Sequence, residues 1–273
     1  MRLHWDAHNP NASDAPILLV GPSLGGNAAQ QWTGVAQKLE NRALVVFLDL
    51  PGHVQSEPWP DETEPTLDAV ASAIIAVLRE VRATYGDRPA VFAGVSLSGA
   101  TALHVARDFP DELSGVVVIA SAATIGEPTA WLERAELVAS GGTAQLVDIT
   151  MKRWFTPTFR AQRRELVEGI LDDLAATDDH SYAQLCRALS VHDVREDLDQ
   201  IRIPTMLIAG GHDTSTPMDR VELVAERVPG AELHVIDGVA HQITVAEPGD
   251  VAVLLQNFLE RVTRPDNRWQ GDD

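Results

Sequence analysis

The stretch Ala90-Val91-Phe92-Ala93-Gly94-Val95-Ser96-Leu97-Ser98-Gly99 decides how this chain of 273 residues folds. Its first four residues are apolar, as in a strand that is buried on both faces, and an apolar stripe after it, through Leu103 and Ala106, predicts a helix. A sharp turn between such a strand and such a helix strains the serine backbone and lifts the hydroxyl above the sheet. The helix N-terminus can also stabilise negative charge there. We therefore expect Ser96 to be a nucleophile.

The turn around Ser96 departs from the usual pattern at one position. Nucleophile turns of this kind commonly read GxSxG, whereas residues 94–98 read GxSxS. Because serine is small and Gly99 follows Ser98 directly, we expect the turn to form. The alternative interpretation is that Ser96 merely caps the following helix, which the strand before it disfavours.

Short apolar runs and helical patterns alternate along the rest of the chain. The apolar runs are 17–20, 44–48, 116–120, 205–209 and 233–236, and the helical patterns are 28–39, 67–81, a helix opened by Pro217, and 248–262. Alternation of this kind predicts an α/β fold with a mostly parallel sheet, right-handed crossovers and helices on both faces. Residues 2–5 can add an antiparallel edge strand, and the polar end, 263–273, is expected to be loose.

The alternation stops after Ala120. Between residues 124 and 189 no strand pattern occurs, and the helical patterns there are 127–139, 143–154, 159–174 and 180–189. This segment is too long for one crossover between neighbouring strands. We expect an α/β core of residues 1–123 and 191–273, into which residues 124–190 are inserted as a helical cap.

The composition excludes several classes of partner. The chain has 40 acidic and 21 basic side chains, a formal net charge of -19, which repels nucleic-acid phosphates and anionic membrane surfaces. It has no run of 18 apolar residues and no pattern of a secretory signal, and its single cysteine, Cys186, fits a reducing compartment. We expect a soluble, cytoplasmic protein that binds neither nucleic acid nor membrane. The oligomeric state does not follow from the sequence.

A serine nucleophile needs a base, and histidine has the pKa for that role near neutral pH. In α/β-hydrolases an acid and a histidine follow the serine in chain order, each after a late strand. Asp213 follows the strand 205–209 and His241 follows the strand 233–236. Both therefore lie at the carboxyl edge of the sheet, where open α/β sheets bind ligands. Asp237 is a rival acid, but it lies too close to His241 on the same connection.

The reaction also needs donors for a tetrahedral oxyanion. The backbone N–H of Leu97 is one, and the loop Gly21-Pro22-Ser23-Leu24-Gly25-Gly26 should supply the other. Pro22 has no N–H, so the N–H of Ser23 is the first choice and that of Leu24 the second. The alternative is that this loop is an ordinary turn. Metal-binding, P-loop and dinucleotide patterns are not found, so no cofactor or metal is implied.

With these residues assigned, the sequence resembles the 3-oxoadipate enol-lactonases of aromatic catabolism, within the α/β-hydrolases, along nearly the whole chain. The general hydrolase motifs, shared with esterases and cofactor-free haloperoxidases, are 20–25, 49–53, 94–99, 201–204, 211–213 and 238–241. The likeness to the lactonases lies in the cap, where Ser121-Ala122 leads to Trp131-Leu132-Glu133-Arg134 and then to Arg153-Trp154-Phe155-Thr156. Two residues depart from the family pattern where glycine is usual, Ser98 and Val54.

The resemblance implies a small lactone substrate that bears one carboxylate and that water opens to a keto acid. Arg134 or Arg153 would bind the carboxylate, and Trp154 and Leu24 would line the pocket. The alternatives are that each arginine is a solvated or salt-bridged surface residue and that Trp154 is part of the cap core. Two other functions stay open. They are a broader carboxylesterase or lactonase with the same triad, and a ligand-binding module without catalysis.

Overall fold

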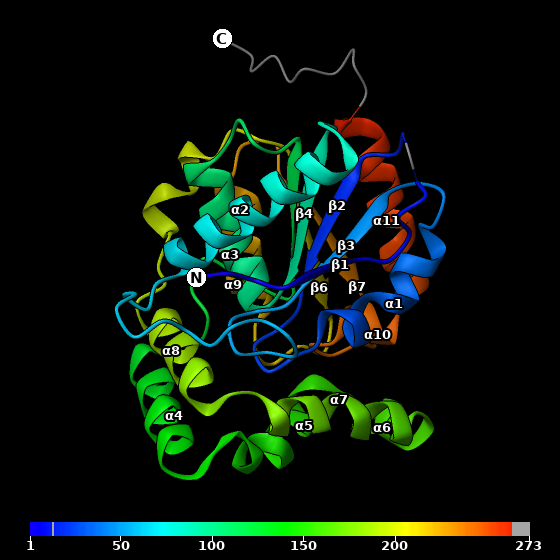
Figure 1. Ribbon diagram of the computed structural model, residues 1–273. Coiled ribbons are helices and arrows are strands. Elements are labelled where there is room, and N and C mark those ends of the chain that lie inside the picture. Colours follow the sequence, from blue (N-terminus) through cyan, green and yellow to red (C-terminus); the bar gives the residue numbers. More distant parts are fainter. Residues whose placement is uncertain (13, 264–273) are drawn as a thin grey trace.

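The computed structural model describes residues 1–12 and 14–263. In this part of the chain one sheet has the strand order β1-β3-β2-β4-β5-β6-β7 (Figure 1). Its strands are β1 (Trp5–Ala7), β2 (Ile17–Gly21), β3 (Leu44–Leu48), β4 (Ala90–Val95), β5 (Gly115–Ile119), β6 (Thr205–Gly210) and β7 (Glu232–Ile236).

The sheet is mostly parallel, as the sequence predicts. Only β1 is antiparallel to its neighbour, β3, and it begins at Trp5, later than the predicted edge strand. The other neighbouring strands pair in parallel. Apart from Thr263, the tail that the sequence predicts to be loose lies outside the described residues.

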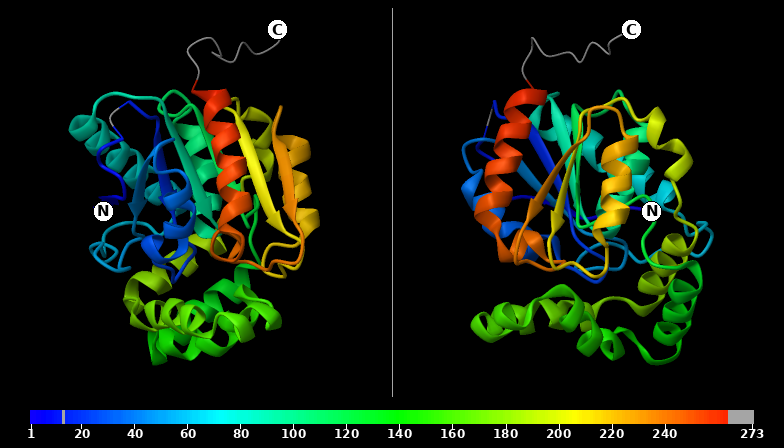
Figure 2. Two further views of the ribbon diagram at one scale, coloured as in Figure 1. Left: turned by 90° about the vertical axis from the view of Figure 1, so that its right-hand side faces the viewer. Right: turned by 180° about the vertical axis from the view of Figure 1, so that it is seen from behind.

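Helices cover both faces of the sheet (Figures 1 and 2). The core helices are α1 (Ala28–Lys38), α2 (Leu67–Tyr85), α3 (Leu97–Asp108), α9 (Met218–Arg227), α10 (Ile243–Ala246) and α11 (Pro248–Val262). Strand β2 shows how the two faces are buried. Ile17 and Leu19 join the apolar cluster that includes α2 and α3, whereas Leu18 and Val20 join the cluster that includes α1 and α11. A strand buried on both faces needs an uninterrupted apolar run, which is what the sequence shows.

Between β5 and β6 the chain forms helices that lie beyond the ends of the strands (Figure 2). They are α4 (Pro128–Gly141), a 3-10 turn (Thr143–Leu146), α5 (Val147–Trp154), α6 (Pro157–Gln162), α7 (Arg164–Ala176) and α8 (Asp179–Ser190). We call residues 124–190 the cap. Helix α4 packs mainly on α8, and α5 packs on α7.

One predicted cap helix is wrong. The pattern over residues 159–174 predicts a single helix, but Arg163 has φ -128° and ψ 43°, which lie outside the helical region and separate α6 from α7. Pro157 occupies the first turn of α6, and Thr156 caps this helix by accepting a hydrogen bond from the N–H of Phe159. The helix therefore starts earlier than predicted and ends after a short run.

Candidate active site

The turn at Ser96 has the strained geometry that the sequence predicts. Ser96 lies between β4 and α3 with φ 57° and ψ -113°, a conformation that a residue with a side chain adopts only where its surroundings impose it. Its backbone N–H donates to the carbonyl oxygen of Ile119 at 2.8 Å, and its carbonyl accepts from the N–H of Ala100 at 2.8 Å. These bonds hold the strained residue in place at the N-terminus of a helix.

The glycines of this turn are required by close backbone contacts. A Cβ on Gly94 would lie 2.2 Å from the backbone of Ser98, and a Cβ on Gly99 would lie 2.6 Å from the Cβ of Ser121. Ser98 itself is accommodated because it lies against Gly21, where a Cβ would approach its Oγ to 2.6 Å. Its fully buried hydroxyl donates to the carbonyl oxygen of Pro22 at 2.6 Å. The unusual serine thus connects the turn at Ser96 to the loop after β2.

Val54, the other departure from the family pattern, also has a structural explanation. It adopts φ 50°, the left-handed region that favours glycine. Its side chain is 57% exposed, so no neighbour opposes it. The departure changes only a turn and costs some backbone strain.

His241 and Asp213 meet at the carboxyl edge of the sheet. Nδ1 of His241 lies 2.7 Å from Oδ2 of Asp213, and both side chains are buried. A neutral imidazole that donates from Nδ1 to a carboxylate leaves its Nε2 as an acceptor, which is the form a general base requires. Asp237, the rival acid, is exposed.

Hydrogen bonds keep Asp213 ionised. Its carboxylate accepts from the N–H of Ser215 at 2.7 Å and from the hydroxyl of Thr216 at 2.6 Å, besides the bond from His241. Burial by itself would raise the pKa of Asp213, but His241 and these donors lower it below its ordinary value. A carboxylate that stays charged can hold His241 in one orientation.

A cavity of about 510 Å³ lies between the core residues Ser96 and His241 and the cap. Ser96, His241, Ser23 and Leu24 line it from the core, and Arg134, Arg153, Trp154, Trp131 and Thr150 line it from the cap. The structure thus places the predicted nucleophile, base and cap residues around one space. Trp154 is 7% exposed and also packs in the apolar core, so it serves both of the roles that the sequence left open.

One predicted oxyanion donor is wrong. The backbone N–H of Ser23 donates to Oε1 of Gln31 at 3.0 Å and is not free for a substrate. The N–H groups of Leu24 and Leu97 have no hydrogen-bond partner in the described part of the chain, and Leu24 lines the cavity. The second choice from the sequence, Leu24, is therefore the better candidate beside Leu97.

Two buried glutamines near this loop escaped the sequence analysis. Gln31 lies on α1, and Gln242 directly follows His241; each is 1% exposed. The side chain of Gln242 donates to the hydroxyl of Ser23 at 2.9 Å, and its backbone N–H donates to the carbonyl oxygen of Trp154 in the cap at 3.1 Å. Proximity to His241 was the only signal for Gln242, and nothing in the sequence pointed to Gln31.

The two arginines of the cavity have no carboxylate partner among the residues that the structure describes. Arg134 lies 4.9 Å from the centroid of the Trp131 ring, and Arg153 lies beside it. Partial burial, followed by repulsion from Arg134, lowers the pKa of Arg153 below its ordinary value. Glu127 also lines the cavity, but Arg220 neutralises it at 2.7 Å. The cap side of the cavity therefore offers positive charge to a ligand.

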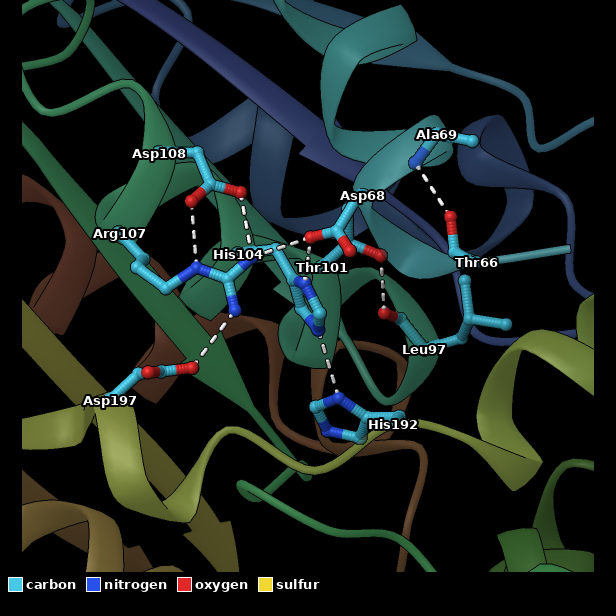
Figure 3. A network of polar contacts seen from close by, with 10 residues as sticks. All are labelled: Thr66, Asp68, Ala69, Leu97, Thr101, His104, Arg107, Asp108, His192 and Asp197. Carbon is cyan, nitrogen blue, oxygen red and sulfur yellow. Dashed lines mark hydrogen bonds and ion pairs between the residues drawn. The ribbon is translucent and has the colours of Figure 1, made fainter. Parts of the chain in front are cut away.

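A polar network fastens the chain that returns from the cap onto the helix of Ser96 (Figure 3). Nε2 of His104, on α3, lies 3.0 Å from Nδ1 of His192, whose Nε2 donates to the carbonyl oxygen of Ala122 at 3.0 Å. On its other side His104 contacts Asp68 of α2 at 2.7 Å. Burial lowers the pKa of His192 to about 4. The network joins both connections between the cap and the core.

Asp68, His104 and Asp108 also place their ligand atoms within 4.8 Å of one another. The guanidinium of Arg107 already lies among these carboxylates (Figure 3), at 2.6 Å from Asp68, 2.7 Å from Asp108 and 3.0 Å from Asp197. Since Arg107 supplies the positive charge that the acidic groups need, the cluster is an ion-pair network.

Sequence comparison identifies the family. The profile described as serine aminopeptidase, S33, matches residues 33–248, which is most of the chain. The chain belongs to the α/β-hydrolase family. In the residues that the structure describes, this hydrolase has no helix that is both long and apolar enough to cross a bilayer.

The relatives of this α/β-hydrolase include lactonases and esterases. It is 32% identical over 236 residues to 3-oxoadipate enol-lactonase 2 of Acinetobacter baylyi, which covers 86% of this chain and 85% of the relative. A pimeloyl-[acyl-carrier protein] methyl ester esterase of Neisseria meningitidis is 28% identical and covers 80% and 69%, respectively. Among solved structures, the enol-lactonase from Burkholderia xenovorans LB400 has the same fold, with a TM-score of 0.87, 24% identity, and 94% and 96% of the two chains covered.

Proposed function

We propose that this α/β-hydrolase opens a small enol-lactone that bears one carboxylate, of the 3-oxoadipate enol-lactone class, through an acyl-enzyme on Ser96. The observation that carries the proposal is the pair of guanidiniums, Arg134 and Arg153, which share a cavity with Ser96 and have no carboxylate partner within the described residues. Two like charges that line one cavity repel each other, and an anion bound between them would relieve this repulsion.

The net charge of the chain strengthens this argument. A net charge of -19 disfavours anionic substrates in general, so a carboxylate needs a local positive site in order to bind. The cap supplies that site opposite the nucleophile, and the guanidinium fork suits a planar carboxylate. The likeness to the Acinetobacter lactonases supports the same substrate class.

In the first half of the proposed reaction, the Oγ of Ser96 attacks the lactone carbonyl carbon while Nε2 of His241 takes the hydroxyl proton. Asp213 stabilises the imidazolium that forms. The N–H groups of Leu97 and Leu24 donate to the oxyanion. When the tetrahedral intermediate collapses, the ring C–O bond breaks and an enolate leaves, which remains attached through the acyl chain.

As the ring C–O bond breaks, the enolate oxygen takes the proton that His241 gained from Ser96, so His241 becomes neutral again. The resulting enol tautomerises to a ketone, which makes ring opening favourable. Water then attacks the ester of Ser96 while His241 takes its proton. The bond to the Oγ of Ser96 breaks, this oxygen regains a proton from His241, and the keto acid leaves. No cofactor takes part in either half.

The ultraviolet absorbance of the enol-lactone tests the substrate class directly. Purified wild-type protein should accelerate its loss, and Arg153→Met should raise KM at least tenfold on this substrate but not on a neutral aryl ester. Arg163→Met is the matched control, because Arg163 is an exposed cap arginine outside the cavity. A wild-type protein that leaves the absorbance unchanged would refute the substrate class.

A broader carboxylesterase is the second candidate. The cavity of about 510 Å³ has the usual size of a small-molecule pocket, which leaves room for esters larger than the enol-lactone. Methyl ester esterases are also among the relatives. A kcat/KM for simple aryl esters well above that for the enol-lactone would favour it. Labelling by a fluorophosphonate that disappears in Ser96→Ala would exclude the third interpretation, a non-catalytic binding module.

We place the proposed reaction in the breakdown of aromatic compounds in the cytoplasm. Genes for enzymes that cycloisomerise muconates and decarboxylate their products should then neighbour the gene for this chain. A genomic neighbourhood without such genes would argue for the esterase instead.

A further inference from the structure

Ser23 lies at the centre of a buried polar network beside Ser96. Its side chain accepts two hydrogen bonds, from Nε2 of Gln31 at 2.8 Å and from Nε2 of Gln242 at 2.9 Å. Its backbone N–H is also engaged, because it donates to Oε1 of Gln31 at 3.0 Å. Because the backbone N–H of Ser23 needs an acceptor, it fixes the amide oxygen of Gln31 at that position and leaves the amide nitrogen to donate to the hydroxyl oxygen.

The hydrogen bonds leave one group of Ser23 free. A serine hydroxyl has two acceptor lone pairs and one donor proton. The two glutamine amides occupy both lone pairs, so the proton must point in the remaining tetrahedral direction. Within the described residues no protein acceptor receives it.

The cavity is where this proton can find an acceptor. Ser23 is 1% exposed, yet it lines the same cavity as Ser96 and His241. It also precedes Leu24, the backbone donor of the proposed oxyanion site. We infer that the hydroxyl of Ser23 donates a hydrogen bond to the carbonyl oxygen of the bound ester or lactone, as a third donor beside the N–H groups of Leu24 and Leu97. This inference rests on the proposed attack by Ser96 on an acyl carbon.

Gln31 and Gln242 act as positioning residues for this hydroxyl. Each of them is 1% exposed, and their side-chain hydrogen bonds go to Ser23. Oε1 of Gln242 is buried and has no partner within the described chain, so the bond from Nε2 to Ser23 is the one side-chain hydrogen bond of Gln242 among the described residues. Gly26 makes room for the arrangement, because a Cβ there would lie 2.1 Å from Nε2 of Gln31. Two buried amides that both donate to one hydroxyl oxygen fix the orientation of that hydroxyl.

The test compares wild type with Ser23→Ala, Ser23→Thr and Gln242→Leu on 4-nitrophenyl acetate, which does not depend on the lactone assignment. An aryl trifluoromethyl ketone serves as the second probe, because it adds to a nucleophilic serine as a tetrahedral oxyanion. Ser23→Ala should lower kcat about 10- to 100-fold with little change in KM, and should weaken ketone inhibition by the same factor. The pKa of the bound hemiketal, measured by fluorine NMR, should rise.

The other two variants separate donation from structural support. Ser23→Thr keeps the hydroxyl and should recover most of the rate, whereas Gln242→Leu should lose less than Ser23→Ala because the donor remains. Ketone inhibition and a hemiketal pKa that stay at the wild-type values in Ser23→Ala would overturn the third donor while leaving the proposed function intact. A wild-type protein that neither hydrolyses the ester nor binds the ketone would overturn both.

Discussion

Acid should destabilise this hydrolase through His53, which the structure holds in its neutral form. His53 is 1% exposed. Its Nδ1–H donates to the carbonyl oxygen of Pro51 at 2.8 Å, and its Nε2 accepts from the N–H of Gly25 at 2.8 Å. Protonation would place a second N–H against that of Gly25. Burial lowers the pKa of His53 to about 4, although the carbonyl of Pro51 and the charge of Asp178 favour the protonated ring.

The size of the effect follows from the two pKa values. A histidine in the unfolded chain has a pKa of about 6.5, so between pH 6.5 and 4 the unfolded state binds a proton that the folded state does not. The free energy of unfolding therefore falls as the pH falls through this range, and it is fully retained above pH 6.5. Each pH unit is worth about 1.4 kcal/mol, so His53 alone should cost about 3 kcal/mol by pH 4.

Urea unfolding of wild type and His53→Gln between pH 7 and 4 measures this contribution. The variant should be less stable than wild type at pH 7, although glutamine can still accept from the N–H of Gly25. Because glutamine does not titrate, this difference in the free energy of unfolding should shrink by about 3 kcal/mol at pH 4. His180→Gln is the control for the loss of a histidine, because the side chain of His180 is 44% exposed. A deficit of His53→Gln that stays constant from pH 7 to 4 would refute the reasoning.

Further substitutions test three other sets of contacts. Gly21→Ala puts a Cβ 2.6 Å from the Oγ of Ser98 and should cost about 1–3 kcal/mol in urea unfolding; Ser98→Gly should recover most of this, and equal losses in the single and double variants would contradict the contact. Asp213→Asn should keep the fold but lower kcat on an aryl ester by about four orders of magnitude, because His241 loses its orienting carboxylate; a loss under tenfold would exclude this role. His192→Leu leaves two buried polar groups unpaired and should lower the free energy of unfolding by about 2–4 kcal/mol, whereas an unchanged urea midpoint would show that the network contributes nothing.

The sequence alone sufficed for the sheet and for the chain order of the catalytic candidates. Strands buried on both faces must be apolar throughout, so the runs at β2 and β4 were visible without any tertiary information. The positions of Ser96, Asp213 and His241 follow from the same runs, because each lies in the connection after a strand and parallel strands end at one edge. Local residue patterns and the order of residues along the chain are therefore enough to predict the strands and the positions of these candidates.

Only the tertiary structure decided which donors are free and which charges are paired. The N–H of Ser23 looked available from its loop, but Gln31, eight residues along the chain on a different element, takes it. Arg134 and Arg153 became interpretable once the structure showed that neither has a carboxylate partner in the part of the chain that it describes. Hydrogen bonds and ion pairs extend only a few ångströms and join residues far apart in the chain, so the sequence contains their members but not their pairing.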